Sequence, residues 1–295
     1  MTDNPKSLKT RIQSGQPILM VELSPPKTGD PGPLRAAAKQ FSGKVHAIGV
    51  SDSRRGVCIS SLAAAALIAA EGVEPVMHLV TRDRNRLALL GACLGAQALG
   101  VRNILCTSGD HQTLGAGPTA KNVFDIDSIQ LLSAVARLEN GAFCLGAVAA
   151  PFADPPEMQL MRLAKKINAG AEFLITQPVF DPDRFGTWWD QVAQRGLPQR
   201  AAIIAGIEPL LDVDQASKFA ESRPRPVIPQ TVLDRLASAG DRVAQRAVGI
   251  ETAVETIRHL SSSACAANGL RGYQIVADDP AAALEIIHRA GLEAA

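Results

Sequence analysis

The sequence has no excess of charge of one sign. Its 295 residues include 30 Lys and Arg and 29 Asp and Glu, which gives a formal net charge of +1. A protein that holds nucleic acid or an anionic membrane surface through its overall field needs a strong positive excess. We therefore expect neither partner. Any anion that the chain binds must be held by a local cluster of cations.

Long apolar runs, an apolar N-terminal segment and closely spaced cysteines are also absent. The longest apolar runs, such as residues 62–70, are far too short to cross a bilayer, and residues 1–16 are polar. No C-x-x-C spacing occurs, which argues against a zinc site, an iron–sulfur cluster or a disulfide framework. We expect a cytoplasmic protein with no metal site and reduced thiols, namely Cys58, Cys93, Cys106, Cys144 and Cys265.

Neither G-x-G-x-x-G nor a Walker A loop is found, so a dinucleotide would need a different grip on its phosphates. One expected helix carries Arg162, Lys165 and Lys166, which share a face because they stand at i, i+3 and i+4. This cluster is either a solvated helix face or a pyrophosphate-binding site. The sequence alone leaves both interpretations open.

Short apolar runs alternate with stretches of helical period, and 46% of the residues are hydrophobic, enough for a large core. The expected strands are 18–23, 45–50, 75–80, 103–107, 143–149, 173–177, 201–206 and 272–276. The clearest amphipathic segments between them are 61–71, 84–100, 127–139, 157–169 and 214–222. Parallel neighbours need crossover helices, and continuous apolar strands indicate burial on both faces. An open doubly wound sheet gives the same local signals, but the count of eight favours a closed barrel.

We therefore predict an α/β fold consisting of a single (β/α)8 TIM barrel domain over residues 1–295. The Pro- and Gly-containing stretches 25–33, 115–118 and 151–156 are the size of loops and follow strands. Residues 224–229 and the long helical tract 231–260 precede the last strand. We expect them to form extra helices there.

In such a barrel the active site lies at the C-terminal ends of the strands, in the loops that follow them. The residues at these ends are Glu22 with Ser24, Ser51 to Ser53, His78, Ser108 to Gln112, Ala150-Pro151, Thr176-Gln177, Glu208 and Tyr273-Gln274. Each allows a structural interpretation as well as a functional one. Glu22 could cap a neighbouring element or pair with a barrel lysine, and residues 108–110 could be only a turn. His78 could be a hydrogen-bonded core residue, and Gln177 could orient a loop. Their shared place at one rim favours function.

Several of these segments resemble the methylenetetrahydrofolate reductase family, over nearly the whole chain. The matching pieces are VELSPPK (21–27), PVMHL (75–79), NILCTSGD (103–110), NAGA (168–171), FLITQ (173–177), QASKFA (215–220) and Gly272-Tyr273. Residues 107–112, TSGDHQ, resemble the short variants associated with corrinoid methyl-transfer pathways. The ordered set is specific, although each piece alone is weak.

The resemblance implies a flavoenzyme that uses FAD to interconvert 5,10-methylenetetrahydrofolate and 5-methyltetrahydrofolate. Glu22 corresponds to the general acid that protonates a folate nitrogen, and Asp110 to the carboxylate beside the flavin. Gln177, Phe219 and Tyr273 correspond to substrate-binding positions. The implied FAD-binding residues are Ser51, Asp52, His78, Ser108, Gly109, Asp110, His111, Phe124, Ala150, Arg162, Lys165 and Lys166.

The sequence departs from the best-known members at three places. Ser108 replaces an arginine, Phe124 replaces a tyrosine, and the run 277–279, Ala-Asp-Asp, stands where an arginine helps to hold the folate tail. The electron partner could thus be NADH, NADPH or a protein carrier. The same barrel could work mainly as a methyltetrahydrofolate oxidase, or be a flavin-free folate- or corrinoid-binding module. The oligomeric state is not readable from the sequence.

Overall fold

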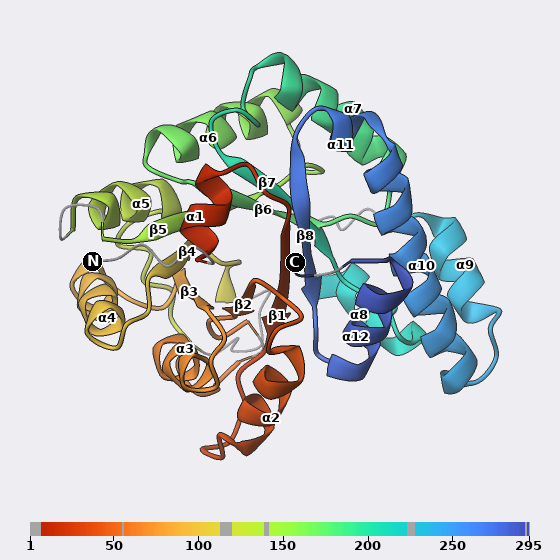
Figure 1. Cartoon of the computed structure of the whole chain (residues 1–295), viewed down its shortest axis with the longest axis horizontal. Coiled ribbons are helices and arrows are strands. Elements are labelled where there is room, and N and C mark those ends of the chain that lie inside the picture. Colours follow the sequence, from red (N-terminus) through yellow and green to blue (C-terminus); the bar gives the residue numbers. More distant parts are fainter. Residues whose placement is uncertain are drawn as a thin grey trace.

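A closed barrel of eight parallel strands forms the centre of the computed structural model, with the strands in sequence order around the ring (Figure 1). The structure describes residues 7–54, 56–112, 120–138, 142–222, 228–292 and 294. The strands are β1 (Ile18–Leu23), β2 (Ala47–Val50), β3 (Pro75–Val80), β4 (Asn103–Thr107), β5 (Cys144–Ala149), β6 (Phe173–Pro178), β7 (Ala202–Ile207) and β8 (Leu270–Val276). The TIM-barrel prediction is confirmed, and every strand end falls within two residues of its expected position.

Helices surround this barrel and connect its strands. They are α1 (Leu8–Gln13), α2 (Gly32–Phe41), α3 (Ser61–Ala70), α4 (Arg86–Ala98), α5 (Ser128–Arg137), α6 (Pro156–Asn168), α7 (Pro182–Gln194), α8 (Val213–Ser222), α9 (Gln230–Ala237), α10 (Arg242–Ser262), α11 (Ala264–Ala267) and α12 (Pro280–Arg289). The stretch 25–33 is not entirely a loop, because α2 begins at Gly32 with a proline in its first turn. That position suits proline, whose missing N–H would have no partner there.

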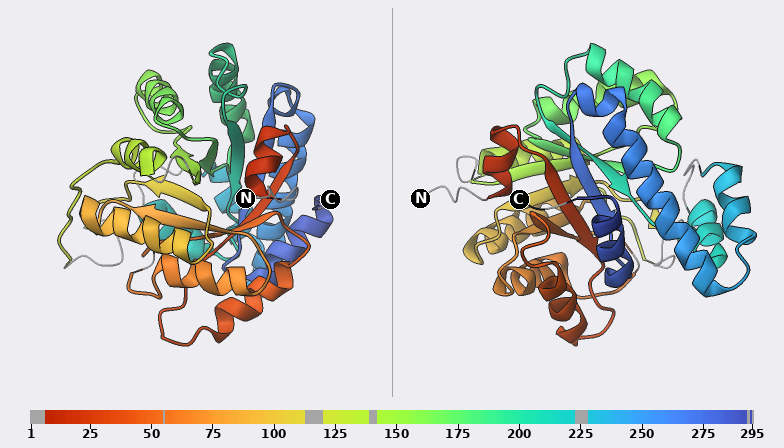
Figure 2. Two further views of the ribbon diagram at one scale, coloured as in Figure 1. Left: turned by 60° about the vertical axis from the view of Figure 1, so that its left-hand side comes forward. Right: turned by 45° about the vertical axis from the view of Figure 1, so that its right-hand side comes forward.

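Extra helices do precede the last strand, as expected, but the tract 231–260 is not continuous. Gly240 adopts a left-handed backbone (φ +82°), and the Asp241 side chain caps a new helix. The tract is therefore divided into α9 and α10. Figure 2 shows α8 and α9 beside one end of α10, at one side of the ring. Residues 115–118 and 224–227 lie outside the described residues.

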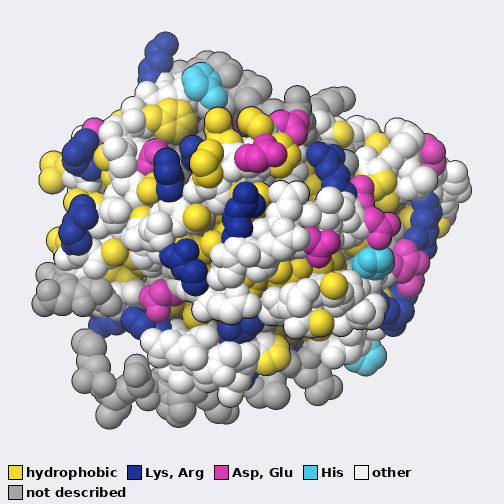
Figure 3. Space-filling model, turned by 90° about the horizontal axis from the view of Figure 1, so that it is seen from above, with side chains coloured by type: hydrophobic (Ala, Val, Ile, Leu, Met, Phe, Trp, Pro, Cys, Tyr) yellow, Lys and Arg dark blue, Asp and Glu magenta, His cyan; other side chains and the backbone are white. Residues whose placement is uncertain are grey.

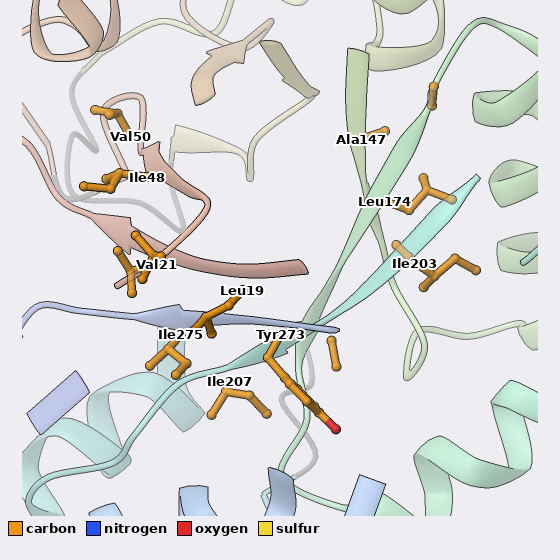
Figure 4. Packing of buried hydrophobic residues seen from close by; sticks show 14 of the residues in the cluster. Leu19, Val21, Ile48, Val50, Ala147, Leu174, Ile203, Ile207, Tyr273 and Ile275 are labelled. Atoms are coloured by element: carbon orange, nitrogen blue, oxygen red, sulfur yellow. The ribbon is translucent and has the colours of Figure 1, made fainter. Parts of the chain in front are cut away.

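Two apolar layers stabilise the barrel. The inner layer fills its interior with alternate strand residues, including Ile18, Met20, Ala47 and Phe173, and Leu8 of α1 joins it at the N-terminal end. The outer layer packs the other strand faces against the helices, as Figure 4 shows for Val21, Ile48 and Ile203 among others. Burial on both faces explains why the strands are continuously apolar in sequence.

The surface agrees with the balanced composition. Figure 3 shows basic and acidic side chains interspersed over one face of the molecule, in line with the formal net charge of +1. In the part of the chain that the structure describes, no helix is long and apolar enough to span a bilayer.

Candidate active site

A polar layer replaces the apolar one where the barrel interior reaches the C-terminal ends of the strands. Successive strand residues alternate between interior and exterior. Counting two residues on from the interior positions Met20, Ala47, Val76, Ile175 and Ile204 gives the next interior layer. That layer comprises Glu22, Gly49, His78, Gln177 and Gly206. The sequence thus brings a carboxylate, an imidazole and an amide to one end of the barrel.

Glu22 is the centre of a buried polar cluster. Its side chain is paired on both oxygens: the Gln274 amide donates to Oε2 at 2.9 Å, and the Arg54 guanidinium donates to Oε1 at 3.2 Å. Arg54 also donates to both oxygens of Glu208, at 2.7 and 3.0 Å. The cation in this ion pair is an arginine, whereas the structural interpretation named a barrel lysine, and the pairing offsets the cost of a buried charge.

His78 and Gln274 leave polar atoms available above Gly49. A Cβ at Gly49 would lie 2.9 Å from His78 Nε2 and 3.4 Å from Gln274 Oε1, so the lack of a side chain allows both groups to pack close to the β2 backbone. Both atoms are buried, and neither has a hydrogen-bond partner among the described residues. Burial lowers the pKa of His78, against the opposing charges of Glu22 and Asp52, so the ring is neutral at pH 7. His78 is therefore not the internally satisfied histidine of the structural interpretation.

A hydrogen-bonded network joins the loops that follow β2, β3 and β4. Asp83 accepts from Arg82 at 2.8 Å, Ser53 at 2.9 Å and Gln112 at 2.6 Å. Burial acts to raise the pKa of Asp83, but these donors outweigh it and the pKa is lowered. Arg82 also donates to the backbone carbonyl of Asp110 at 3.2 Å. The network therefore fixes the loop that carries Asp110.

Ser51 and Asp52 lie at the end of β2 and are both buried. Asp52 accepts from the backbone N–H of Val80 at 3.0 Å and contacts the guanidinium of Arg84. Burial raises the pKa of Asp52, mainly against the charge of Arg84. These contacts connect β2 to β3 and leave Asp52 engaged within the protein.

The turn after β4 has the conformation that its sequence indicates. Gly109 has φ +74°, a backbone conformation that favours glycine. A Cβ there would also approach a Val80 methyl to 2.8 Å, so the position has no room for a side chain. Ser108 Oγ accepts from the Ser128 N–H at the start of α5, at 3.2 Å. The carboxylate-bearing residue Asp110 is exposed at the rim, as is His111, whose ring lies 2.6 Å from the Asn122 amide nitrogen.

Phe124 has a left-handed backbone (φ +42°) and remains 39% exposed. A positive φ is unusual for an aromatic residue and costs about 1–3 kcal/mol. The loop is held in place by the adjacent Val123 N–H, which donates to the Arg82 carbonyl at 2.7 Å. An exposed ring in a strained conformation is typical of a ligand-binding position.

The three basic residues of the cluster on α6 differ in how far they are exposed to solvent. Arg162 and Lys165 are exposed, whereas Lys166 is half-buried and donates to the Val148 carbonyl at 2.5 Å. Burial, together with the charge of Arg162, lowers the pKa of Lys166 to about 8, although Asp127 opposes this. Asp127 is the N-cap of α5, so the Lys166 ammonium lies near that helix N-terminus. The charge of Lys166 and the positive end of the α5 helix dipole therefore lie close together, and both would attract an anion.

The other expected site residues lie in different environments. Ala150 is half-buried just after β5, and Gln177 is half-buried in the interior layer. Phe219, on α8, is 7% exposed and packs edge-on against Phe180, with ring centroids 5.4 Å apart. This aromatic pair lies beyond the end of β6, within the apolar cluster that includes Leu210.

The structure does not bring Tyr273 to the site. Its side chain leaves β8 on the outer face, as Figure 4 shows, and its hydroxyl donates to the Ile257 carbonyl of α10 at 3.2 Å. The Ser261 hydroxyl lies 2.6 Å from the same oxygen. The neighbouring Gln274 faces inward instead, because consecutive strand residues point to opposite faces. Alternation along β8 could have identified Gln274 from the sequence.

Arg54 and Glu208 are two further contributors to the polar cluster to which the sequence analysis assigned no role. Glu208 stands directly after β7, where any barrel presents its functional residues, so its position was a usable signal. Arg54 lies in an irregular loop, and no periodicity indicates where its side chain points. Only the folded chain shows that it bridges two carboxylates 186 residues apart, Glu22 and Glu208.

Comparison with known proteins identifies the family. The family model described as methylenetetrahydrofolate reductase matches residues 7–291. The chain belongs to this family. A probable methylenetetrahydrofolate reductase (NADPH) from Caenorhabditis elegans is 28% identical over 209 residues, 69% of this chain and 31% of that protein. The 5,10-methylenetetrahydrofolate reductase of Escherichia coli K12 is 29% identical over 150 residues, 51% of this chain and 49% of that protein. The matched stretch thus spans half or less of these relatives' length.

Solved structures agree with the barrel fold. An uncharacterized protein from Clostridium thermocellum that binds two copies of 5-methyl-5,6,7,8-tetrahydrofolic acid superposes with a TM-score of 0.70. It is 14% identical and covers 96% of this chain and 97% of its own. Oxaloacetate acetylhydrolase superposes with a TM-score of 0.54 at 14% identity, covering 96% of this chain and 83% of its own. At such low identity the likeness concerns the fold alone.

Proposed function

We propose that the chain is an FAD-dependent methylenetetrahydrofolate reductase, in which one barrel binds both the flavin and the folate. The observation that carries this proposal is the polar cluster in the barrel interior. A buried carboxyl, Glu22, is held in place by Gln274 and interacts with a neutral imidazole, His78. The Nε2 atom of His78 has no hydrogen-bond partner among the described residues. A family member with this arrangement has a proton donor and buried polar atoms without partners at the same strand ends.

Glu22 supplies the proton in this proposal. Opening the methylene bridge of 5,10-methylenetetrahydrofolate breaks a carbon–nitrogen bond, and the departing nitrogen must take up a proton. Gln274 fixes the orientation of the Glu22 carboxyl, so that the other oxygen faces Arg54 and the barrel mouth. Gln177 offers an amide in the same interior layer, and the buried Phe180–Phe219 pair lies beyond the end of β6. These are the residues that would orient the folate.

The residues present fit a bound FAD. The atoms His78 Nε2 and Gln274 Oε1, which have no hydrogen-bond partner among the described residues, could bond to the polar atoms of a flavin ring system. The glycine turn at Gly109 allows close backbone approach, and Lys166 of α6, which interacts with the α5 N-cap residue Asp127, offers a charge for a pyrophosphate. When bound, FAD supplies the two-electron redox chemistry, and the protein supplies orientation and field.

We expect Asp110→Asn to raise the midpoint potential of the bound flavin. The exposed carboxylate at the rim adds negative charge near the cofactor, which disfavours adding electrons to it. Removing one charge should raise the potential on the order of 30 mV, equivalent to about 1.4 kcal/mol for a two-electron couple. Dye-equilibration measurements give the potential. Asp190→Asn, which removes an exposed carboxylate from α7, is the control, and equal potentials in all three proteins would contradict the electrostatic role.

The test of the whole proposal is the purified protein itself. We expect it to carry noncovalent FAD, visible in its absorption spectrum, and to exchange electrons with 5-methyltetrahydrofolate in an anaerobic titration. Parallel titrations with NADH and NADPH identify the electron partner. Exchange with folate but with neither nucleotide would favour an oxidase that uses a protein carrier. A colourless protein that binds the folate but no added FAD would replace the proposal with a binding module.

A further inference from the structure

Arg54 forms an ion-paired bridge across the mouth of the barrel. It comes from the loop after β2, and its guanidinium reaches the end of β1 on one side and the end of β7 on the other. It makes two contacts to Glu208, at 2.7 and 3.0 Å, and one to Glu22, at 3.2 Å. The Glu208 side chain is only 2% exposed, so water does little to stabilise its charge and Arg54 provides the compensation.

The charged groups that face Glu22 come from several elements. Arg54 contacts Glu22 directly, and Glu208 is linked to it through Arg54. His78 on β3 interacts with Glu22 electrostatically. Asp278, after β8, acts on Arg54 and accepts from Ser24 Oγ at 2.9 Å. Burial acts to lower the pKa of Arg54, but Glu208 and Glu22 outweigh it, so the guanidinium stays charged. With His78 neutral, Arg54 is a cation in direct contact with Glu22.

We propose that Arg54 and Glu208 act as a pair of positioning residues that set, with opposite signs, how readily Glu22 releases its proton. The inference rests on the proposed role of Glu22 as the proton donor. With Glu22 protonated, the three side chains together carry no net charge. After donation they carry one negative charge, while the folate has become cationic. Arg54 stabilises the carboxylate that donation creates, and Glu208 limits that stabilisation by sharing the guanidinium.

The two partners therefore have predictable and opposite effects on proton transfer. A cation beside a carboxyl lowers its pKa by about 1–3 units, and a second carboxylate raises it. Arg54→Gln should therefore shift the titration midpoint of Glu22 upward by about 1–2 pH units. Glu208→Gln should shift the titration midpoint of Glu22 downward, because the charge of Arg54 is then no longer shared with a second carboxylate. The double variant removes both charges and should return the midpoint towards that of the wild type.

Two measurements on the folded 295-residue chain test this. The first follows the carboxyl carbon of Glu22 by NMR during a pH titration, with the signal assigned by its loss in Glu22→Gln. The second is the pH profile of the folate half-reaction of the flavin-loaded protein, whose limb should move with the NMR midpoint. Arg54→Lys keeps the charge and should stay near the wild-type midpoint. Arg289→Gln, which breaks a distant ion pair with Glu251, is the matched control.

Opposite shifts in the two single variants, cancelled in the double variant, would support the inference. A merely structural role for Arg54 would lower rates or stability without moving the midpoint in opposite directions. Shifts of the same sign, or unchanged midpoints in both single variants, would overturn it. If the midpoints shift as expected but the wild-type protein shows no reaction with folate, the proposed function is wrong and the coupling of the three side chains remains.

Discussion

Glu22→Gln should slow the folate half-reaction by about two to four orders of magnitude, which is the usual contribution of a general acid. Glutamine keeps the size of the side chain, and its amide oxygen can still accept from Arg54, but it has no acidic proton to give. The departing folate nitrogen would then have to take its proton from water. Because Glu22 is buried at the strand end, water is a poor substitute there.

Rapid mixing of the two half-reactions separates proton donation from disturbance of the flavin. Flavin reduction by whichever pyridine nucleotide the protein accepts should change much less, since it needs no proton from Glu22. Glu74→Gln is a matched control at the opposite end of the barrel, where Glu74 accepts from the Asn103 amide at 2.8 Å. Equal slowing of both half-reactions would indicate a misplaced flavin. An unchanged folate step would exclude Glu22 as the acid.

The barrel was predictable because its strands are buried on both faces. Each appears in the sequence as a short apolar run, and the eight runs are separated by segments long enough for crossover helices. Helix boundaries were less certain. The division between α9 and α10 depends on Gly240 and Asp241, whose turn and cap signals are weak inside a long amphipathic tract.

The site was only partly predictable, for a geometric reason. Residues within strands have a direction fixed by alternation, so Glu22, His78 and Gln177 could be placed in one layer. The same rule separates Gln274 from Tyr273, which faces α10. Loop residues have no such rule. The side chain of Arg54 reaches the end of β7, 154 residues further along the chain, and nothing in its local sequence indicates that partner.

The clearest electrostatic signature outside the barrel mouth belongs to Lys166. Its ammonium is half-buried against the Val148 carbonyl, and burial lowers its pKa to about 8. The amine is therefore charged at pH 7 and becomes neutral as the pH rises above about 8. A bound pyrophosphate would favour the charged form. Binding of FAD above that pH would then require uptake of a proton.

We expect FAD affinity of the flavin-free protein to be steady below pH 7 and to fall as the pH rises through about 8, where Lys166 loses its charge. Lys166→Met keeps the apolar stem but removes the charge, and should weaken binding at pH 7 by roughly 10- to 100-fold, the equivalent of one charge-assisted hydrogen bond. It should also abolish the pH dependence.

Lys165→Met, at an exposed position, should have a smaller effect because solvent screens its charge. Flavin-fluorescence titrations from pH 6.5 to 9 measure both quantities, with Lys44→Met as a distant control. A Lys166→Met protein that retains both the affinity and the slope would show that the pyrophosphate is held elsewhere.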